Sequence, residues 1–302
     1  MTRLLIRTLL LLPALTACTH FQLGLSAYHH GDYATAFREF QQAARDGDAE
    51  AQHNLGLLYA QGQGVQQDYG EARHWFGKAA AQGLRDAQFN LGLMYLEGQG
   101  GPKNPAEAAR WFRKAAEQRE VRAELNLGLL YDEGIGVPQS DVEAFRWYKE
   151  AAEGGLAAAQ FNLALMYDHG QGTPPNDQEA VRWYRKAAER GDATAQYHLG
   201  LMYDEGEGVP KDDREAVRWY RRAAEQGEPS AQHNLGLMYA KGEGTAQDNV
   251  TAYLWLALAA AGGYQDSFQS KEAVAKKMTL AQVAEAEKLI HEWQARKKLA
   301  RR

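Results

Sequence analysis

Cysteine is almost absent from this chain, because Cys18 is the only one among 302 residues. A single cysteine excludes a disulfide within the chain. Long apolar runs are also missing: the stretch from Leu9 to Leu15 is far shorter than the roughly 20 residues that a membrane-spanning helix needs. Basic residues are not in excess, with 34 Lys and Arg against 39 Asp and Glu. This balance argues against a nucleic-acid-binding protein, in which we expect a basic stripe.

The usual signatures of catalysis are missing as well. The sequence has no Gly-x-Ser-x-Gly, Ser-x-x-Lys or Lys-Thr-Gly motif, which are typical of serine acyl transfer, and no His-Glu-x-x-His zinc motif. The acidic loop from Asp204 to Asp213 lacks the alternating ligands of a calcium site. The adjacent His29 and His30 do not share a helix face. We therefore expect no catalytic residue, no cofactor and no metal site.

Internal repetition is the dominant feature of the sequence. An Asn-Leu-Gly-x-x-Tyr motif recurs with two deviations, Ala164 for its Gly and His198 for its Asn, and a Trp series and a series of Ala pairs accompany it. Every step is 36 residues, a period that is typical of stacked structural repeats. The series are Tyr59, Tyr95, Tyr131, Tyr167, Tyr203 and Tyr239; Trp75, Trp111, Trp147, Trp183, Trp219 and Trp255; and the Ala pairs that begin at Ala43, Ala79, Ala115, Ala151, Ala187, Ala223 and Ala259.

One repeat is predicted to contain two helices. Apolar residues at helical spacing indicate a first helix, helix A, over residues 50–61, and a second, helix B, over residues 69–82. Gly62 and Gly64 end helix A, and Gly83 ends helix B, because glycine readily adopts left-handed backbone conformations. Such a hairpin cannot bury its own apolar face, so neighbouring hairpins must stack. The Trp series is then most simply part of the core.

The predicted fold is therefore all-α, a right-handed α/α superhelical solenoid of about seven helix-turn-helix repeats. No stretch of alternating polar and apolar residues predicts a strand. We expect a shortened first repeat within residues 18–48, six repeats of 36 residues over 49–264, and capping helices with a basic tail over 265–302. These repeats are predicted to form one elongated domain.

The layout resembles the Sel-one-like repeat (SLR) family, a relative of the tetratricopeptide repeat, from about Phe21 to Trp293. In the first full unit the matching residues are Ala51, Leu55, Gly56, Tyr59, Gly62, Gly64, Ala72, Trp75, Phe76, Ala79, Ala80 and Gly83. Departures are Ala164 for Gly, Arg119 for the terminal Gly and Leu256 for an aromatic residue. The resemblance implies a non-enzymatic protein-interaction scaffold, in envelope assembly, export or virulence. The β-lactam activity reported for cysteine-rich members does not transfer, since no cysteine follows Cys18.

The N-terminal residues indicate export. Arg3 and Arg7 precede the apolar run, which is typical of a signal peptide over residues 1–17. The segment from Leu15 to Cys18 resembles a bacterial lipobox, which implies lipidation of Cys18 and anchoring on the periplasmic side of the envelope, with the outer membrane favoured by Thr19. The alternative is an ordinary signal peptide with an incidental cysteine.

Two rows of residues on helix A predict a partner-binding face. In an α-solenoid of this kind, helices A line the concave side. One row varies among aromatic, His and Leu side chains, and the other is a ladder of Asn, whose amide can pair with a peptide backbone. The candidate residues are His53, Asn54, Phe89, Asn90, Leu125, Asn126, Phe161, Asn162, Tyr197, His198, His233 and Asn234.

Alternatives remain open for this face. The Asn ladder is equally explained as a set of caps for the loops of adjacent repeats, and a Leu row four residues beyond the ring row is equally explained as buried between neighbouring helices A. The prediction is binding of other proteins or peptide segments on the concave face. The other functions considered are a cell-wall or β-lactam-related enzyme and a glycan-binding solenoid.

Overall fold

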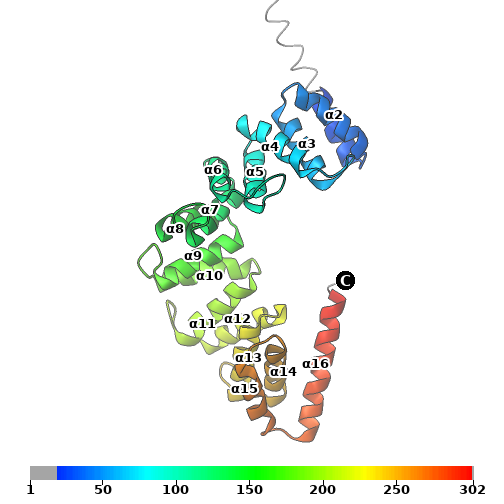
Figure 1. The fold of residues 1–302 in the computed structure, drawn as a ribbon. Coiled ribbons are helices and arrows are strands. Elements are labelled where there is room, and N and C mark those ends of the chain that lie inside the picture. Colours follow the sequence, from blue (N-terminus) through cyan, green and yellow to red (C-terminus); the bar gives the residue numbers. More distant parts are fainter. Residues whose placement is uncertain (1–18, 301–302) are drawn as a thin grey trace, which may run out of the picture. The chain divides into compact units, whose positions relative to one another are not determined.

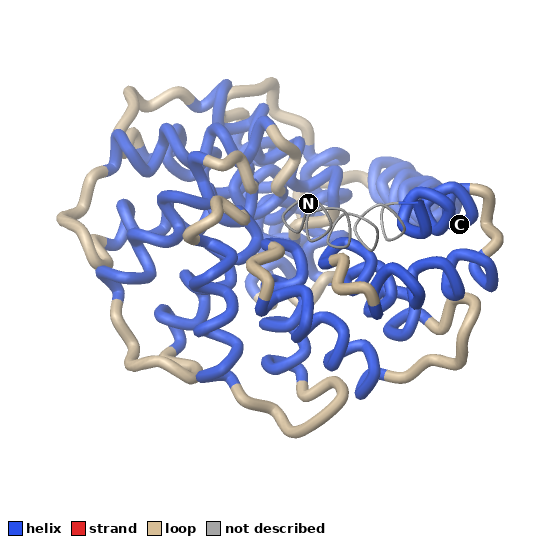
Figure 2. Tube along the Cα trace, turned by 90° about the horizontal axis from the view of Figure 1, so that it is seen from above, coloured by secondary structure: helices blue, strands red, loops and turns tan. Residues whose placement is uncertain are grey.

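The computed structural model describes residues 19–300, and all regular elements in that range are helices (Figure 1, Figure 2). The predicted all-α repeat fold is confirmed. Residues 19–29 are helical. The following helices are α2 (Tyr33–Arg45), α3 (Ala49–Gln61), α4 (Tyr69–Ala81), α5 (Arg85–Glu97), α6 (Pro105–Ala116), α7 (Val121–Glu133), α8 (Asp141–Glu153), α9 (Ala157–His169), α10 (Asp177–Glu189), α11 (Ala193–Glu205), α12 (Asp213–Gln226), α13 (Pro229–Lys241), α14 (Asn249–Ala261), α15 (Asp266–Ala275) and α16 (Leu280–Ala300).

Contacts within the chain gather into two compact units. The boundary lies inside α8, between Ala151 and Ala152. The division is natural for a repeat array, because each repeat contacts only its neighbours. We refer to the described residues on either side as the N-terminal unit (19–151) and the C-terminal unit (152–300). Within residues 19–300, no helix is both long enough and apolar enough to cross a bilayer.

Each full repeat is a helix A followed by a helix B, as predicted. In the first repeat these are α3 and α4, which reproduce the expected ranges to within one residue. The later pairs follow in chain order, α5 with α6 through α13 with α14, and we number the repeats one to six accordingly. Gly62 ends α3 in the left-handed conformation, with φ of 67°, and its N–H donates to the Leu58 carbonyl. The predicted role of this glycine is confirmed.

The second glycine of the Gly-x-Gly pair lies against the preceding helix B in five repeats, at Gly64, Gly100, Gly136, Gly208 and Gly244. Gly64 has a φ of 68°, and a Cβ placed on it would lie 2.1 Å from the Tyr33 carbonyl oxygen, at the start of the preceding helix B. Gly244 has the same relation to the carbonyl of Asp213. Any side chain at these positions would force neighbouring hairpins apart.

Helix B begins at a polar cap that the sequence analysis did not identify. Asp68 accepts hydrogen bonds from the N–H groups of Gly70 and Glu71, which otherwise have no partner in the first helical turn. The same role recurs every 36 residues, at Asn104, Ser140, Asn176, Asp212 and Asp248. The caps set the point at which each loop turns into helix B.

The core of each repeat combines small and aromatic side chains. The Ala pairs of the repeats are buried, and the Trp side chains are buried except for the half-buried Trp111. The motif glycine of helix A lies against an aromatic ring of helix B, since a Cβ on Gly56 would lie 2.8 Å from the Phe76 ring. The structure therefore confirms that the Trp series is core.

A buried position on helix B changes together with one on helix A. In repeats three, four and five it is Tyr, and the hydroxyls of Tyr148, Tyr184 and Tyr220 donate to Asp132, Asp168 and Asp204 at 3.2, 3.0 and 3.4 Å. In repeats one, two and six the pairs are Phe76 with Ala60, Phe112 with Leu96, and Leu256 with Ala240. An acceptor is thus present only where a buried hydroxyl needs one.

A pair of glutamines closes the junction between the end of helix B and the start of helix A. The Nε2 of Gln52 donates to the Ala44 carbonyl at 3.1 Å, and its Oε1 accepts from Gln82 at 2.8 Å. Gln82 also donates to the Gly47 carbonyl, at 3.0 Å. Repeats two and five contain the equivalent pairs, Gln88 with Gln118 and Gln196 with Gln226. We call this arrangement the Gln pair.

The third repeat replaces the helix-A glutamine of this pair by a carboxyl group. Glu124 is only 2% exposed, and burial raises its pKa, partly offset by Arg119. Arg119 occupies the position of the terminal glycine and has a φ of 63°, which side-chain-bearing residues rarely adopt. Its guanidinium also lies 3.5 Å from Glu150.

The two ends differ from the full repeats. The helix over residues 19–29 and α2 form the predicted shortened repeat, in which a Cβ on Gly24 would meet the Phe40 ring at 2.6 Å. At the other end, the Thr279 hydroxyl accepts from the Gln282 N–H and caps the start of α16. The closing helix α16 extends to Ala300. Arg296, Lys297 and Lys298 therefore belong to the helix.

We predict that the Tyr–Asp pairs are stability determinants that can be exchanged as a unit. Asp168→Ala leaves the buried Tyr184 hydroxyl without an acceptor and should lower the free energy of unfolding by about 1–3 kcal/mol. Adding Tyr184→Phe reproduces the Phe76 and Ala60 combination of repeat one and should recover most of that loss. Urea unfolding of both variants measures the difference, and equal losses would contradict the prediction.

We further predict that Glu124→Gln stabilises the protein at neutral pH. The pKa of Glu124 is raised in the folded state. At pH values between its ordinary and its raised pKa, the folded protein binds a proton that the unfolded protein does not, so the free energy of unfolding falls as pH rises through this range. Glutamine at this position removes the loss and can donate to the Ala116 carbonyl, as its counterparts do in other repeats, which is worth about 1 kcal/mol. Thermal melts should show a clear gain at pH 7 and little gain at pH 4. A pH-independent effect would argue against buried ionisation as the cause.

Candidate protein-interaction face

The candidate residues lie on the helices A, in two groups that we describe separately. In the N-terminal unit they are on α3, α5 and α7, and in the C-terminal unit on α9, α11 and α13. We call these surfaces the N-terminal A face (His53, Asn54, Phe89, Asn90, Leu125 and Asn126) and the C-terminal A face (Phe161, Asn162, Tyr197, His198, His233 and Asn234).

The ring row packs against helix B of its own repeat. The ring centroids of His53 and Phe76 are 5.5 Å apart, and those of Phe161 and Tyr184 are 5.9 Å apart. Tyr197 lies 6.0 Å from Tyr220 in the same manner. His53, Phe161 and Tyr197 stay half-buried, so each ring has one supported side and one accessible edge. Such rings are held in place before any partner arrives, which lowers the entropy lost on binding.

Phe89 and His233 do not fit this description, and the prediction that they are accessible is wrong. Phe89 is 6% exposed because the Arg122 guanidinium lies 4.3 Å above its ring. His233 is 7% exposed because Tyr264 stacks on it at 4.7 Å and Ser267 hydrogen-bonds its Nδ1 at 2.8 Å. Both rings are covered by residues that lie about one repeat further along the chain. The local motif does not indicate that these residues cover the rings.

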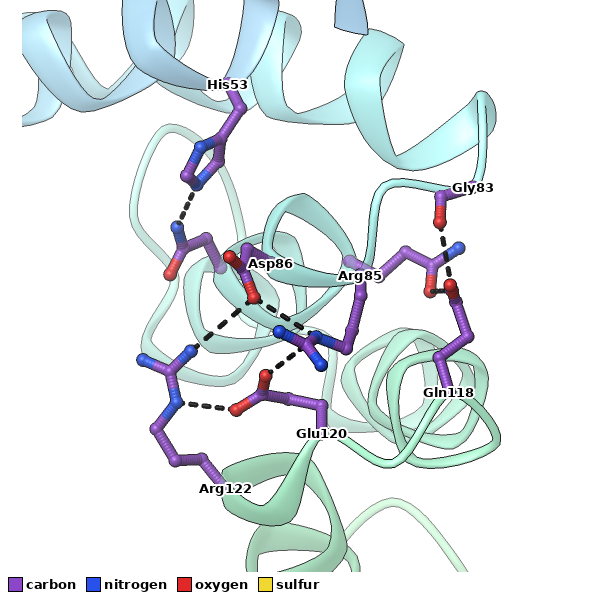
Figure 3. Close-up of polar contacts among 9 residues, drawn as sticks. His53, Gly83, Arg85, Asp86, Gln118, Glu120 and Arg122 are labelled. Atoms are coloured by element: carbon purple, nitrogen blue, oxygen red, sulfur yellow. Dashed lines mark hydrogen bonds and ion pairs between the residues drawn. The ribbon is translucent and has the colours of Figure 1, made fainter. Parts of the chain in front are cut away.

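An ion-pair cluster beside Phe89 was not anticipated from the sequence. Figure 3 shows the Glu120 carboxylate between two guanidiniums, with Arg122 Nε at 2.6 Å and Arg85 Nε at 3.2 Å. Asp86 lies 3.4 Å from Arg85 and 3.9 Å from Arg122. The Glu120 side chain is only 8% exposed. A sequence signal did exist for two of these charges, since Glu120 and Arg122 follow Arg119, where the 36-residue pattern departs from Gly.

The Asn ladder does not cap the loops of adjacent repeats in the contacts observed. Asn54 and Asn126 donate to carbonyls of their own helices, those of Glu50 and Arg122, both at 2.8 Å. Asn90 instead lies 2.9 Å from His53 Nε2, and so joins repeats one and two (Figure 3). Asn162 and Asn234 are half-buried. The amides of Asn54, Asn90 and Asn126 are thus held in fixed orientations at the edge of the ring row.

The Leu row is half-buried for five of its six members. Leu57 packs against the core that α4 and α5 share, and Leu201 and Leu237 pack against the core of the C-terminal unit. Leu129 is more accessible, at 36%. Burial between neighbouring helices therefore accounts for part of each side chain. The remaining apolar area borders the rings and the amides.

His198 contacts more aromatic rings than any other residue of the C-terminal A face. Its ring stacks on Tyr184 at 5.1 Å with 13° between the planes, and lies 5.6 Å from Phe161. Burial lowers the pKa of His198, with a smaller opposing effect of Asp168. Burial lowers the pKa of His53 in the same way. Both rings are therefore neutral at neutral pH, and the row is uncharged.

The two faces differ in the residues that border them. In the N-terminal unit the position three residues before the ring row is Glu50, Asp86 and Arg122, and burial, followed by the charge of Asp86, raises the pKa of Glu50. In the C-terminal unit the same position is Ala158, Thr194 and Ser230. The N-terminal A face is thus bordered by charges and the C-terminal A face by small, uncharged residues.

The geometry contains no recognisable centre for metal binding. Across residues 19–300, no three His, Cys, Asp or Glu side chains are grouped so that they could hold a metal ion. The outer sides of the buried Trp rings are covered by cations, such as Lys78 at 4.4 Å from Trp75 and Lys186 at 3.8 Å from Trp183. Cys18, the predicted lipidation site, lies outside the described residues.

Comparison with known proteins agrees with this architecture. The Sel1 repeat matches residues 49–84, 85–119, 121–156, 157–192, 193–228 and 229–264. The structure of a Sel1 repeat protein from Oxalobacter formigenes is 37% identical with a TM-score of 0.67, covering 81% of this chain and 96% of that one. A protective antigen present in uropathogenic Escherichia coli strains, which displays an SLR fold, is 27% identical with a TM-score of 0.51, covering 92% and 84%. A search of curated proteins finds no match.

The matched repeats make up more than half of the chain, and they coincide with the helix pairs described above. Proteins built from Sel1 repeats generally mediate protein–protein interactions and are generally not enzymes. By the repeated match and by its helical repeat fold, this chain belongs to the Sel1 repeat family.

Proposed function

We propose that this protein is a non-enzymatic scaffold that binds segments of other proteins on its A faces. The observation that carries the proposal is the pair of A faces, where half-open rings and partly exposed Leu side chains adjoin amides that are oriented at Asn54, Asn90 and Asn126. Apolar edges supply area for burial, and amides supply donors and acceptors for a peptide backbone. This combination suits an extended or helical polypeptide segment.

We also propose that the protein is lipid-anchored and faces the periplasm, with the outer membrane favoured. The support is the sequence of residues 1–18, in which a basic start and a short apolar run precede Cys18. A role in envelope assembly, export or virulence is consistent with the relative that is described as a protective antigen of uropathogenic strains. A diacyl anchor would keep the repeats close to partners in the envelope.

We predict that a charge on the A face disrupts partner binding. Leu129→Glu places a carboxylate among apolar contacts and should weaken binding at least tenfold, because burying an unpaired charge is costly. A photo-crosslinker at Tyr197 or Leu125, combined with mass spectrometry, identifies the partner in cells. Binding of that purified partner to the variants then gives the affinities.

Val142→Glu is the matched control for this experiment. Val142 is 65% exposed on α8, away from the A-face rows, and undergoes the same change from aliphatic to acidic side chain. It should leave affinity and melting temperature unchanged. If Leu129→Glu and Val142→Glu bind the partner equally well, and the Tyr197 crosslinks are also absent, the A faces are not the binding surface.

We predict that Cys18→Ser abolishes lipid attachment. The thiol is the only one in the chain that could carry a diacylglycerol, and serine offers no sulfur. Labelling of cells with an alkyne fatty acid should mark the native protein and not the variant, and the variant should leave the membrane fraction. Labelling that persists in the variant would exclude the lipobox interpretation.

A further inference from the structure

The Gln pair is a small binding site that the chain fills with its own side chain in repeats one, two and five. In repeats one and two, the carboxamide nitrogen at the end of helix B donates to two acceptors, the Oε1 of the helix-A glutamine and the carbonyl of the preceding loop glycine. In the second copy, Gln118 donates to the Gly83 carbonyl (Figure 3). The distances are 2.9 Å to that carbonyl and 2.8 Å to Gln88 Oε1. The site therefore recognises an NH₂ group between two oxygens.

The fourth repeat has the site without its occupant. Arg190 takes the position of the second glutamine, and Gln160 Oε1 is buried with no hydrogen-bond partner. Gln160 itself is 3% exposed and still donates to the Ala152 carbonyl, at 3.1 Å, so its orientation matches the other repeats. The Arg190 guanidinium instead lies beside Gly155, within 3.3 Å of where a Cβ on that glycine would stand.

A cavity of about 400 Å³ opens at this point of the C-terminal unit. It is lined by Gln160, Gly155, Glu153, Lys186, Glu189 and Arg190, together with Ala152. Its two acids and two cations balance, so the cavity has no net preference for an ion. Arg190 is exposed at the rim and can swing aside, because its guanidinium makes no ion pair within residues 19–300.

The sixth repeat has a second cavity at the equivalent place, and it too lacks the second glutamine. Gly262 takes the glutamine position there, and a cavity of about 510 Å³ is lined by Gly227, Gln232 and Gly262. These residues lie 72 positions beyond Gly155, Gln160 and Arg190, which is two repeat periods. In this repeat Gln294 and Lys298 of α16 also border the cavity. The fourth repeat has the cavity without that cover.

We propose that the cavity at Gln160 binds a carboxamide, supplied by an Asn or Gln side chain of a partner protein. Its NH₂ group donates to Gln160 Oε1 and to the Gly155 carbonyl, as Gln82 and Gln118 do in their own repeats. Its carbonyl accepts from Lys186 or from the displaced Arg190. This inference rests on the proposed function for the source of the carboxamide, but the site itself does not depend on the A faces.

The test uses propionamide as the probe and the side-chain amide signals of the full chain in ¹⁵N NMR. Propionamide should shift the Gln160 signal saturably, at millimolar concentration, and more strongly than propionate or propylamine of the same size. The Gln196 signal should not shift, since its site holds Gln226. Arg190→Gln should abolish the Gln160 response and raise the melting temperature by about 2–4 °C, because it restores the pair.

Two further variants complete the test. Arg190→Ala removes the cover and should keep or increase the response at Gln160, while Gln226→Ala should create a new response at Gln196. The proposal is overturned if neither the native protein nor Arg190→Ala responds to propionamide, or if Arg190→Gln responds as the native protein does. Leu129→Glu should leave the probe response unchanged, so failure of the A-face proposal and failure of this one are separately visible.

Discussion

The rest of the structure depends on close contact between one helical hairpin and the next. A single hairpin of two 13-residue helices exposes an apolar face, and only a neighbouring hairpin can cover it. The contact requires residues without bulk at fixed places. Gly64 touches the backbone at Tyr33, and the Ala pairs allow the helices to approach, so that the Trp and Phe rings fill what remains. Because the same demand recurs in every repeat, the same residues recur every 36 positions.

Positions that depart from the repeat are where individual chemistry enters. Some departures are compensated, as where Tyr184 replaces a Phe and Asp168 supplies the acceptor that its hydroxyl requires. Others are not compensated within the same repeat, as at Arg190, where Gln160 loses its donor and a cavity results. In a repeat protein the regular copies serve as internal references, so an uncompensated change identifies a feature that packing does not explain.

Much of the fold was predictable, and much less of the candidate site. Helix limits such as Ala49–Gln61 follow from apolar spacing and from Gly62, both of which act over a few residues. The accessibility of the ring row was not predictable in the same way. Phe89 and Phe161 occupy the same motif position, yet Arg122 covers the first and leaves it 6% exposed, while the second stays half-open. The covering residue belongs to the next repeat, at a position that the motif leaves variable.

The sequence by itself determined the helical class, the repeat period, the glycine stops and the burial of the Trp series, because local backbone preference and periodic hydrophobicity are properties of short segments. The pattern typical of a signal peptide and the lack of common catalytic motifs are also visible in the sequence alone. The tertiary structure alone decided which rings are open, how Glu120 is held between Arg85 and Arg122, and where a glutamine lacks its partner. Those outcomes depend on side chains from neighbouring repeats, whose distances and orientations are set only when the hairpins stack.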